Sequence, residues 1–300
     1  MIDAEFKNKY KEYKKDVEDF INSTLIVSTL PQKNIYESQT YSLSNGGKRL
    51  RPVLALAVCE ALKGKKEYVL PFAVAIEKIH TYSLVHDDLP AMDNDDYRRG
   101  RLSTHKVYGE AMAILTGDAL LNSAFETMSE CCVKYLQDCP HMLQAMSYIA
   151  RAAGSEGMIG GQVIDIESEG MGVIPYELLK KMHSCKTGAL IKASVISSAM
   201  ICNPNKNVMC ALDDYSDALG LAFQIKDDLL DVEGEFDKLG KTIGKDSENN
   251  KPTYVSLFGI EKARELLIQA TSIAINSVKI PEINSEFLIY LAKYLQERNK

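Results

Sequence analysis

Five aspartates occupy one ten-residue stretch of the chain, and carboxylates at this density can bind a divalent cation. They follow an apolar segment at 68–85 and comprise Asp87, Asp88, Asp93, Asp95 and Asp96. A solvated acidic loop is the ordinary interpretation of such a run. However, this run closes a helix that we expect to be buried, where an uncompensated charge is costly. Carboxylate oxygens are the ligands that Mg2+ prefers, usually one or two per ion, so the stretch is a candidate metal site.

A second acidic cluster closes another largely apolar helical segment. It comprises Asp227, Asp228 and Asp231, and Gln224 precedes it. Asp227 and Asp231 are four residues apart and therefore share one helix face. Taken alone, this cluster could be an exposed helix edge. Two such clusters favour carboxylates that meet across a cleft and share a metal site.

Asp87 and Asp93 cannot share one face of a regular helix. Six steps of about 100° place them about 120° apart. Pro90 lies between them, removes a backbone donor and disfavours helical geometry at the preceding residue. We therefore expect the helix to deform at Pro90.

A cationic segment with the sequence GGKRLRP lies earlier in the chain, at 46–52. Glycines such as Gly47 let backbone approach a ligand, and Lys48 and Arg51 are placed for an anion. The segment is not a P-loop, because the G-x-x-x-x-G-K-[ST] spacing is missing. His80, about two turns before Asp87, could donate a hydrogen bond to a phosphate. The alternative for the segment is a helix start with incidental charges. The alternative for His80 is a structural histidine.

Helical patterning accounts for almost the whole chain, broken by Gly, Pro, Asn or polar clusters. Convincing period-2 strands are absent and no linker divides the chain. We therefore expect one all-α domain over residues 1–300, a single large helical bundle with a central cleft, and a frayed tail at 296–300. The expected helices are 3–25, 49–63, 68–88, 108–137, 141–166, 176–201, 206–232, 259–278 and 284–297.

The composition is that of a folded acidic protein. A formal net charge of -6 excludes an overall basic footprint for nucleic acid, and 46% hydrophobic residues can form a sizeable core. Seven cysteines without paired C-x-x-C spacing predict reduced core thiols. No apolar run reaches the roughly 20 residues of a membrane span, and the N-terminus is patterned as an amphipathic helix rather than a signal sequence. We expect a cytoplasmic protein without stable membrane insertion.

Six motifs, in this order, resemble those of the trans-isoprenyl diphosphate synthases, and specifically the bacterial farnesyl type. They are GGKRLRP at 46–52, IHTYSLVHDDLPAMDNDDYRRG at 79–100, GGQVID at 160–165, KTGAL at 186–190, FQIKDDLLD at 223–231 and LGKTIGKD at 239–246. Each motif alone is weak, but together they span nearly the whole chain and are specific. The resemblance implies the isoprenoid synthase fold and a prenyltransferase that condenses an allylic diphosphate, dimethylallyl or geranyl, with isopentenyl diphosphate.

The resemblance also implies a role for each matching residue. Three Mg2+ ions, or Mn2+ in their place, would be held by Asp87, Asp93 and Asp227, with support from Asp88, Asp228 and Asp231. The allylic diphosphate would be steadied by Arg98, Lys186 and Lys241. The second diphosphate would be bound by Gly47, Lys48, Arg51, His80 and Arg99. Thr187 and Gln224 would face the allylic carbon, and the cleft wall would include Gln162 and Asp165.

Tyr82 bears on the expected product length. It lies five residues before Asp87, about 7.5 Å deeper along the helix, where an aromatic ring would form a floor for the growing chain. The resemblance implies that a bulky residue here, with Ser83 beside it, stops the product at fifteen carbons. We therefore favour farnesyl over geranyl or geranylgeranyl diphosphate. Ordinary core packing of Tyr82 is the alternative. The resemblance further implies a homodimer.

Three other functions fit part of the pattern. A terpene cyclase shares the fold and the metal chemistry but needs no second diphosphate pocket, which the segment at 46–52 would supply. A non-catalytic partner subunit commonly lacks one or both aspartate clusters, and both are intact here. A generic acidic metal-binding module would leave the cationic residues unexplained.

Overall fold

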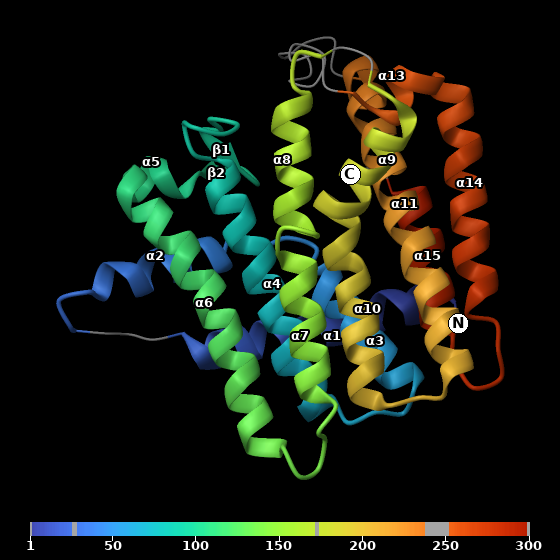
Figure 1. Cartoon of the computed structure of the whole chain (residues 1–300), viewed down its shortest axis with the longest axis horizontal. Helices are drawn as coiled ribbons and strands as arrows, with labels where there is room; N and C mark the ends of the chain where they lie inside the picture. Colours follow the sequence, from blue (N-terminus) through green and yellow to red (C-terminus); the bar gives the residue numbers. More distant parts are fainter. Residues whose placement is uncertain (1, 26–28, 172–173, 238–251, 299–300) are drawn as a thin grey trace.

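The computed structural model describes residues 2–25, 29–171, 174–237 and 252–298, without the side chains of 233–237. This part of the chain is helical apart from one two-stranded antiparallel hairpin, in which Tyr97 pairs with Leu102. The expected all-α class is confirmed. Most of the longer helices run along the vertical direction of Figure 1.

The elements follow in chain order. They are α1 (Asp3–Thr24), α2 (Lys33–Leu43), α3 (Leu50–Ala61), α4 (Lys66–Asp87), β1 (Tyr97–Arg98), β2 (Arg101–Leu102), α5 (Thr104–Tyr108), α6 (Glu110–Tyr135), α7 (Met142–Ala153), α8 (Met158–Ser168), α9 (Tyr176–His183), the π-helix η1 (Ser184–Gly188), α10 (Ala189–Cys202), α11 (Lys206–Asp237), α13 (Tyr254–Phe258), α14 (Ile260–Ser277) and α15 (Glu286–Glu297).

Helices α4 and α10 form the centre of the bundle. α10 packs against α3, α4, α7 and α11, and α4 packs against α3 and α6 as well. Buried residues occur all around both helices, which explains why neither sequence has a polar face. The continuous helix Tyr176–Cys202 is the one described segment long and apolar enough to cross a membrane, and most of it is buried against other helices, as in a core helix.

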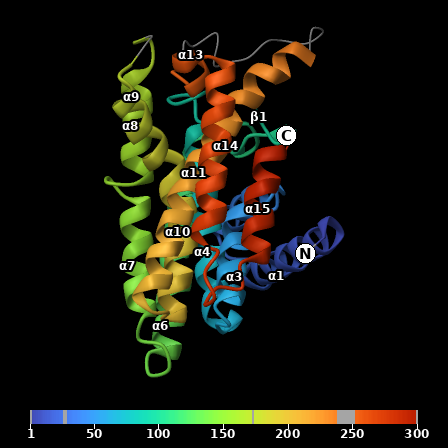
Figure 2. The same ribbon diagram turned by 90° about the vertical axis from the view of Figure 1, so that its right-hand side faces the viewer.

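Both aspartate clusters lie at the same end of the bundle. α4 ends at Asp87 beneath β1, and the last turns of α11 lie beside α13, all in the upper part of Figure 1. α11, α14 and α15 pack side by side, as Figure 2 shows. The fold therefore brings two helix segments far apart in sequence to one end of the molecule.

Several expected boundaries are wrong for identifiable reasons. The segment 141–166 forms two helices, broken where Gly157 approaches the preceding turn so closely that a Cβ would lie 2.0 Å from the Ala152 oxygen. The helix that carries the second aspartate cluster continues to Asp237, so that cluster lies within the helix instead of closing it. Helices α2, α5 and α13 were not expected, because short helices show little periodicity.

Two further expectations need correction. All seven cysteines are free, but Cys210 is exposed and is therefore not a core thiol. The tail is not frayed throughout, because α15 extends to Glu297 and the next residue, Arg298, is buried. Residues 299 and 300 lie outside the described residues.

Candidate active site

The last turn of α4 presents Asp87, and the chain then turns back at Pro90. The Asp93 backbone N–H donates to the Asp87 carbonyl oxygen at 2.9 Å, which returns Asp93 to the helix end. The expected deformation at Pro90 is thus confirmed as the end of the helix. The Asp87 carboxylate accepts a 2.5 Å hydrogen bond from Gln162 Nε2 and lies 4.0 Å from Lys186 Nζ.

Asp88 faces away from Asp87 and is almost fully buried, with 3% of its surface exposed. Arg98 donates to its carboxylate, with Nε at 2.9 Å and a second bond from Nη2. Arg98 belongs to β1, so the small hairpin places this guanidinium at Asp88. Asp88 therefore fits the supporting role that the resemblance implies.

Gly161 lets α8 pack directly against η1. A Cβ at this position would lie 2.1 Å from the Lys186 backbone nitrogen, so no other residue fits without separating the two elements. This close approach allows Lys186 Nζ to donate to Asp165 at 2.5 Å. Thr187 is half-buried in the same π-helical turn, a distortion that often occurs at functional sites. The role of Gly161 was missed; the paired glycines of GGQVID were the available signal.

The carboxylates of the second cluster differ in their partners and in their exposure. Asp228 is buried, and it accepts hydrogen bonds from Gln224 Nε2 at 2.9 Å and from the Tyr254 backbone N–H at 2.7 Å. Since a carboxylate only accepts, the Gln224 amide nitrogen must face it, and the amide oxygen is left pointing elsewhere. Asp227 pairs with Arg298, and Asp231 is exposed.

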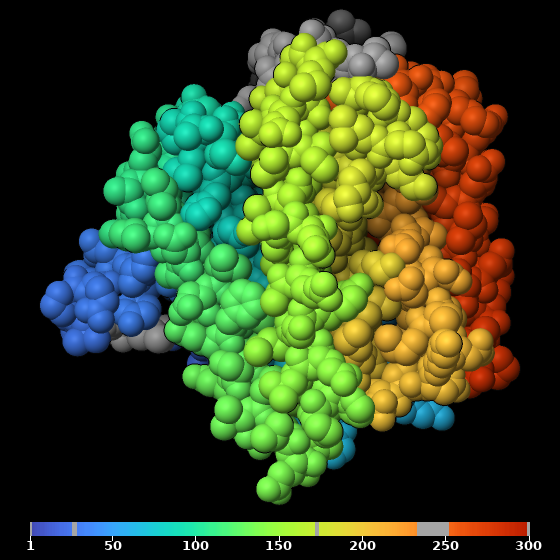
Figure 3. Space-filling model, in the orientation of Figure 1, coloured from blue at the N-terminus to red at the C-terminus, as the bar shows by residue number. Residues whose placement is uncertain are grey.

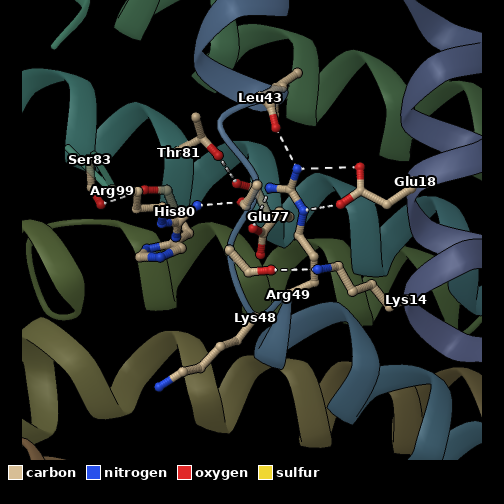
Figure 4. Close-up of polar contacts among 12 residues, drawn as sticks. Lys14, Glu18, Leu43, Lys48, Arg49, Glu77, His80, Thr81, Ser83 and Arg99 are labelled. Carbon is tan, nitrogen blue, oxygen red and sulfur yellow. Dashed lines mark hydrogen bonds and ion pairs between the residues drawn. The ribbon is translucent and has the colours of Figure 1, made fainter. Parts of the chain in front are cut away.

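The cationic segment is shaped by its glycines. Gly47 has φ +110°, and a Cβ there would lie 2.4 Å from Arg99 Nη1. Arg99 Nη1 instead donates to the Gly46 carbonyl oxygen at 2.6 Å, and Figure 4 places Arg99 beside His80. Arg51 Nε is buried and makes no hydrogen bond to a described residue. A buried donor of this kind needs a partner, and an incoming anion would supply one.

Arg49 has a structural role that the sequence reasoning did not assign. It is 2% exposed and donates to Glu18 at 2.8 Å, to Glu77 at 2.9 Å and to the Leu43 carbonyl oxygen. Figure 4 shows its guanidinium enclosed by these acceptors, while Lys48 extends in a different direction. Arg49 therefore anchors the segment from inside.

Burial sets the protonation of the central groups. It raises the pKa of Asp87 to about 6, a shift that Lys186 opposes and Asp93 reinforces. The carboxylate is ionised at neutral pH at an energetic cost that a bound cation would reduce. Burial lowers the pKa of His80 well below its usual range, and Arg51 and Arg99 lower it further. The imidazole is therefore neutral near pH 7 and can donate one hydrogen bond.

Residues of α11 and of α4 both lie close to the cationic segment. Burial raises the pKa of Asp227; Arg298 opposes this shift most strongly, and Lys48 and Arg51 are also close enough to oppose it. Arg51 also lies close to His80 on α4. Asp227 on α11 and His80 on α4 are thus both close to Arg51.

The donor set fits Mg2+. No three Asp, Glu, His or Cys side chains gather into an all-protein cage within the described part of the chain. Mg2+ seldom uses such cages, since it retains waters and takes one or two carboxylates plus substrate phosphates. Asp87, Asp93 and Asp227 would supply oxygen ligands of this kind. Lys241 lies outside the described residues.

Tyr82 lies below Asp87 on α4 and is 6% exposed. Its ring makes an edge-on contact with the His86 ring, at 5.6 Å between centroids. His86 in turn fills the space over Gly117 on α6, where a Cβ would lie 2.0 Å from His86 Nε2. Ser83 is half-buried and donates to the His80 carbonyl oxygen at 2.9 Å. Tyr82 is thus buried beside His86, and His86 contacts α6.

The chain is similar to known prenyl diphosphate synthases. Residues 32–279 match the family described as polyprenyl synthetase. A farnesyl diphosphate synthase from Micrococcus luteus is 44% identical over 287 residues, 95% of this chain and 97% of the relative. A geranylgeranyl diphosphate synthase from Cyanophora paradoxa is 43% identical over 297 residues, 96% and 95% of the two chains. The crystal structure of an FPP/GFPP synthase from Zymomonas mobilis has a TM-score of 0.87 at 35% identity and covers 98% of this chain and 99% of that chain. The chain therefore belongs to the polyprenyl synthetase family and is a prenyltransferase with the all-helical isoprenoid synthase fold.

Proposed function

We propose that the protein is a cytoplasmic, Mg2+-dependent farnesyl diphosphate synthase, which condenses dimethylallyl and then geranyl diphosphate with isopentenyl diphosphate. The observation that carries the proposal is the pairing of two unlike sites around the end of α4. One offers oxygen ligands from Asp87 and Asp93 beside Lys186. The other offers cations around Arg51, whose Nε has no hydrogen-bond partner among the residues that the structure describes. Two substrates that each carry a diphosphate require two such sites.

Different side chains would bind the metal, the allylic diphosphate and the isopentenyl diphosphate. Asp87, Asp93 and Asp227 would hold the metal, which when bound stabilises the negative charge of the departing diphosphate. Lys186 and Arg98 orient that diphosphate, and Lys48, Arg51, His80 and Arg99 hold the isopentenyl diphosphate. The allylic C–O bond breaks, and the isopentenyl double bond attacks the allylic cation. The released diphosphate takes the final proton, so no protein nucleophile is required.

The Gln224 amide oxygen has a defined part in this scheme. Asp228 fixes the amide nitrogen, so the oxygen dipole is free to face the allylic cation, together with the Thr187 hydroxyl. A dipole that is oriented in advance stabilises developing charge without reorganisation. Asp228 acts here through Gln224.

Incubation of the purified protein with Mg2+, geranyl diphosphate and isopentenyl diphosphate tests the proposal. We expect a fifteen-carbon linear diphosphate, identified by chromatography and mass spectrometry, that requires both substrates and disappears when the metal is chelated. A cyclic hydrocarbon from one substrate alone would indicate a terpene cyclase. No product from the two substrates together would contradict the proposal.

The product length depends on Tyr82. Replacing Tyr82 with Ala should remove the floor between α4 and α6 and shift products toward twenty carbons or longer, read as the fraction of each chain length. Tyr82→Phe keeps the ring and should leave the profile unchanged. Tyr68→Ala truncates another buried tyrosine of α4. It therefore controls for the effect of a packing defect in α4 on product length. The Cyanophora relative makes geranylgeranyl diphosphate synthase the second candidate, which a twenty-carbon product from the parent protein would establish.

We also propose a homodimer formed through α6, α7 and α8. These helices lie on the face shown in Figure 3, where α8 lies above α7 and α6 lies beside α7. Ile159, Val163 and Ile166 form one stripe of α8, and they are 41–47% exposed. Leu115 on α6 and Leu143 on α7 add to the exposed apolar surface. Unpartnered apolar surface of this extent is typical of an interaction site, and a second copy would cover it isologously.

Introducing charge into this face should separate the subunits. The double variant Leu115→Glu with Ile159→Glu is expected to halve the molecular mass measured by light scattering after gel filtration. Ile268→Glu with Ile273→Glu changes two comparably exposed residues of α14 and should leave the mass unchanged. A parent protein with the mass of one chain would disprove the dimer.

A further inference from the structure

Arg298, the residue after α15, binds a carboxylate of the second aspartate cluster. Its Nη2 donates to Asp227 Oδ1, across 71 residues of sequence. The same nitrogen donates to the Phe223 carbonyl oxygen at 3.3 Å, and the guanidinium lies 4.3 Å from the centre of the Phe223 ring. Three contacts therefore fix this group against one turn of α11.

The two partners differ sharply in exposure. The Arg298 side chain is 5% exposed, whereas that of Asp227 is 39% exposed. Arg298 is held inside the protein, and Asp227 reaches from it toward the site. Because the arginine takes Oδ1, the second oxygen of Asp227 remains available to a ligand from the site.

We propose that Arg298 is a positioning residue, which orients Asp227 so that its second oxygen can bind the metal that accompanies a diphosphate. The inference rests on the proposed function. Metal-binding carboxylates are commonly held in this way by hydrogen-bond donors behind them, which fix the ligand and tune its strength. The guanidinium does not repel the incoming complex, because the metal arrives with a diphosphate that carries several negative charges.

The first cluster has a related arrangement. Arg98 binds Asp88 there, from the hairpin that follows the cluster in sequence. At the second cluster the arginine comes from the distant end of α15 instead. Each cluster thus has one carboxylate bound by an arginine from another element, although in the first it is the supporting aspartate.

Binding of inorganic diphosphate, measured by calorimetry at a series of Mg2+ concentrations, tests the proposal without turnover. The quantity read is the Mg2+ concentration that gives half-maximal binding. For Arg298→Gln we expect this concentration to rise about 10- to 100-fold. Arg298→Lys keeps the charge without the planar fork and should be intermediate. Arg151→Gln removes an arginine whose side chain is 77% exposed, and this variant should match the parent.

Two results with Arg298→Gln would overturn the inference. A lower half-saturating Mg2+ concentration would identify Arg298 as a counter-ion that the metal displaces. An unchanged concentration together with a lower melting temperature would make it only an anchor for α15. If the parent protein bound no diphosphate at any Mg2+ concentration, the proposed function itself would be contradicted, and the inference with it.

Discussion

Replacing Asp87 with Asn should reduce the rate of product formation by roughly 10³-fold or more. The change keeps the size of the side chain but removes the negative charge that would bind the metal, and electrostatic stabilisation of a departing group is usually the largest contribution to such a reaction. The rate is measured as prenyl diphosphate product formed under saturating substrates and Mg2+. Asp138→Asn removes an exposed aspartate far from the site and should retain the parent rate. An Asp87→Asn enzyme within tenfold of the parent would contradict the assigned ligand role.

The same substitution should stabilise the metal-free protein at neutral pH. Folding raises the pKa of Asp87 from an ordinary value of 3.8 to about 6. Between these pH values the folded state binds more protons than the unfolded state, so stability falls as pH rises through this window. At pH 7 the cost is at most about 3 kcal/mol, since each pKa unit corresponds to about 1.36 kcal/mol.

Denaturant unfolding in the presence of a chelator measures this effect. Asp87→Asn should be more stable than the parent at pH 7. The difference should shrink as pH falls from about 6 to about 4, and it should vanish at lower pH, where the carboxyl is protonated in both states of the parent. Loss of activity together with a gain in stability is expected for a residue whose buried charge serves function and costs stability. A variant that loses both would indicate a structural role for Asp87.

Replacing Glu77 with Leu should cost about 3–5 kcal/mol in the free energy of unfolding. Glu77 and Arg49 are each 2% exposed and are joined by a 2.9 Å hydrogen bond. Removing one partner of a buried ion pair leaves an uncompensated charge in the core. Glu18 and the Leu43 carbonyl remain as partners for Arg49, so the lower end of this range is expected.

Two further variants separate the charge effect from packing. Arg49→Met combined with Glu77→Leu removes both charges and should recover much of the lost stability, because apolar replacement of a whole buried pair is often neutral. Glu60→Leu breaks an exposed pair with Lys9 and should change stability by less than about 1 kcal/mol. Equal losses in the single and double variants would show that packing, and not charge, explains the effect.

The Glu77→Leu substitution should also weaken substrate binding. Arg49 lies between Lys48 and Arg51 and anchors both through the start of α3. Glu77→Leu should therefore raise the KM for isopentenyl diphosphate more than that for the allylic diphosphate. A rise confined to the allylic substrate would contradict the division of the two diphosphate sites.

Local features of the sequence were sufficient for much of the fold and of the candidate site. The break after Asp87 follows from Pro90, which acts on its immediate neighbours. The shared face of Asp227 and Asp231 follows from helix geometry. The composition of the apolar segments that form α4 and α10 is sufficient to predict that these helices are buried. Residue types also limited the chemistry, because hard oxygen ligands beside basic residues favour a metal and a phosphorylated substrate.

Only the tertiary structure decided which partner each charged side chain has. Nothing near Asp227 in sequence indicates Arg298, and nothing near Asp228 indicates the Tyr254 backbone N–H. The presence of a glycine at position 161 does not by itself reveal that the Lys186 backbone packs against it. Helix periodicity fixes the direction of a side chain relative to its own helix, whereas its partner depends on how distant helices pack. For that reason the sequence identified the reactive groups, and the packing of α8, η1, α11 and α15 determined which of them face the site and which hold the others in place.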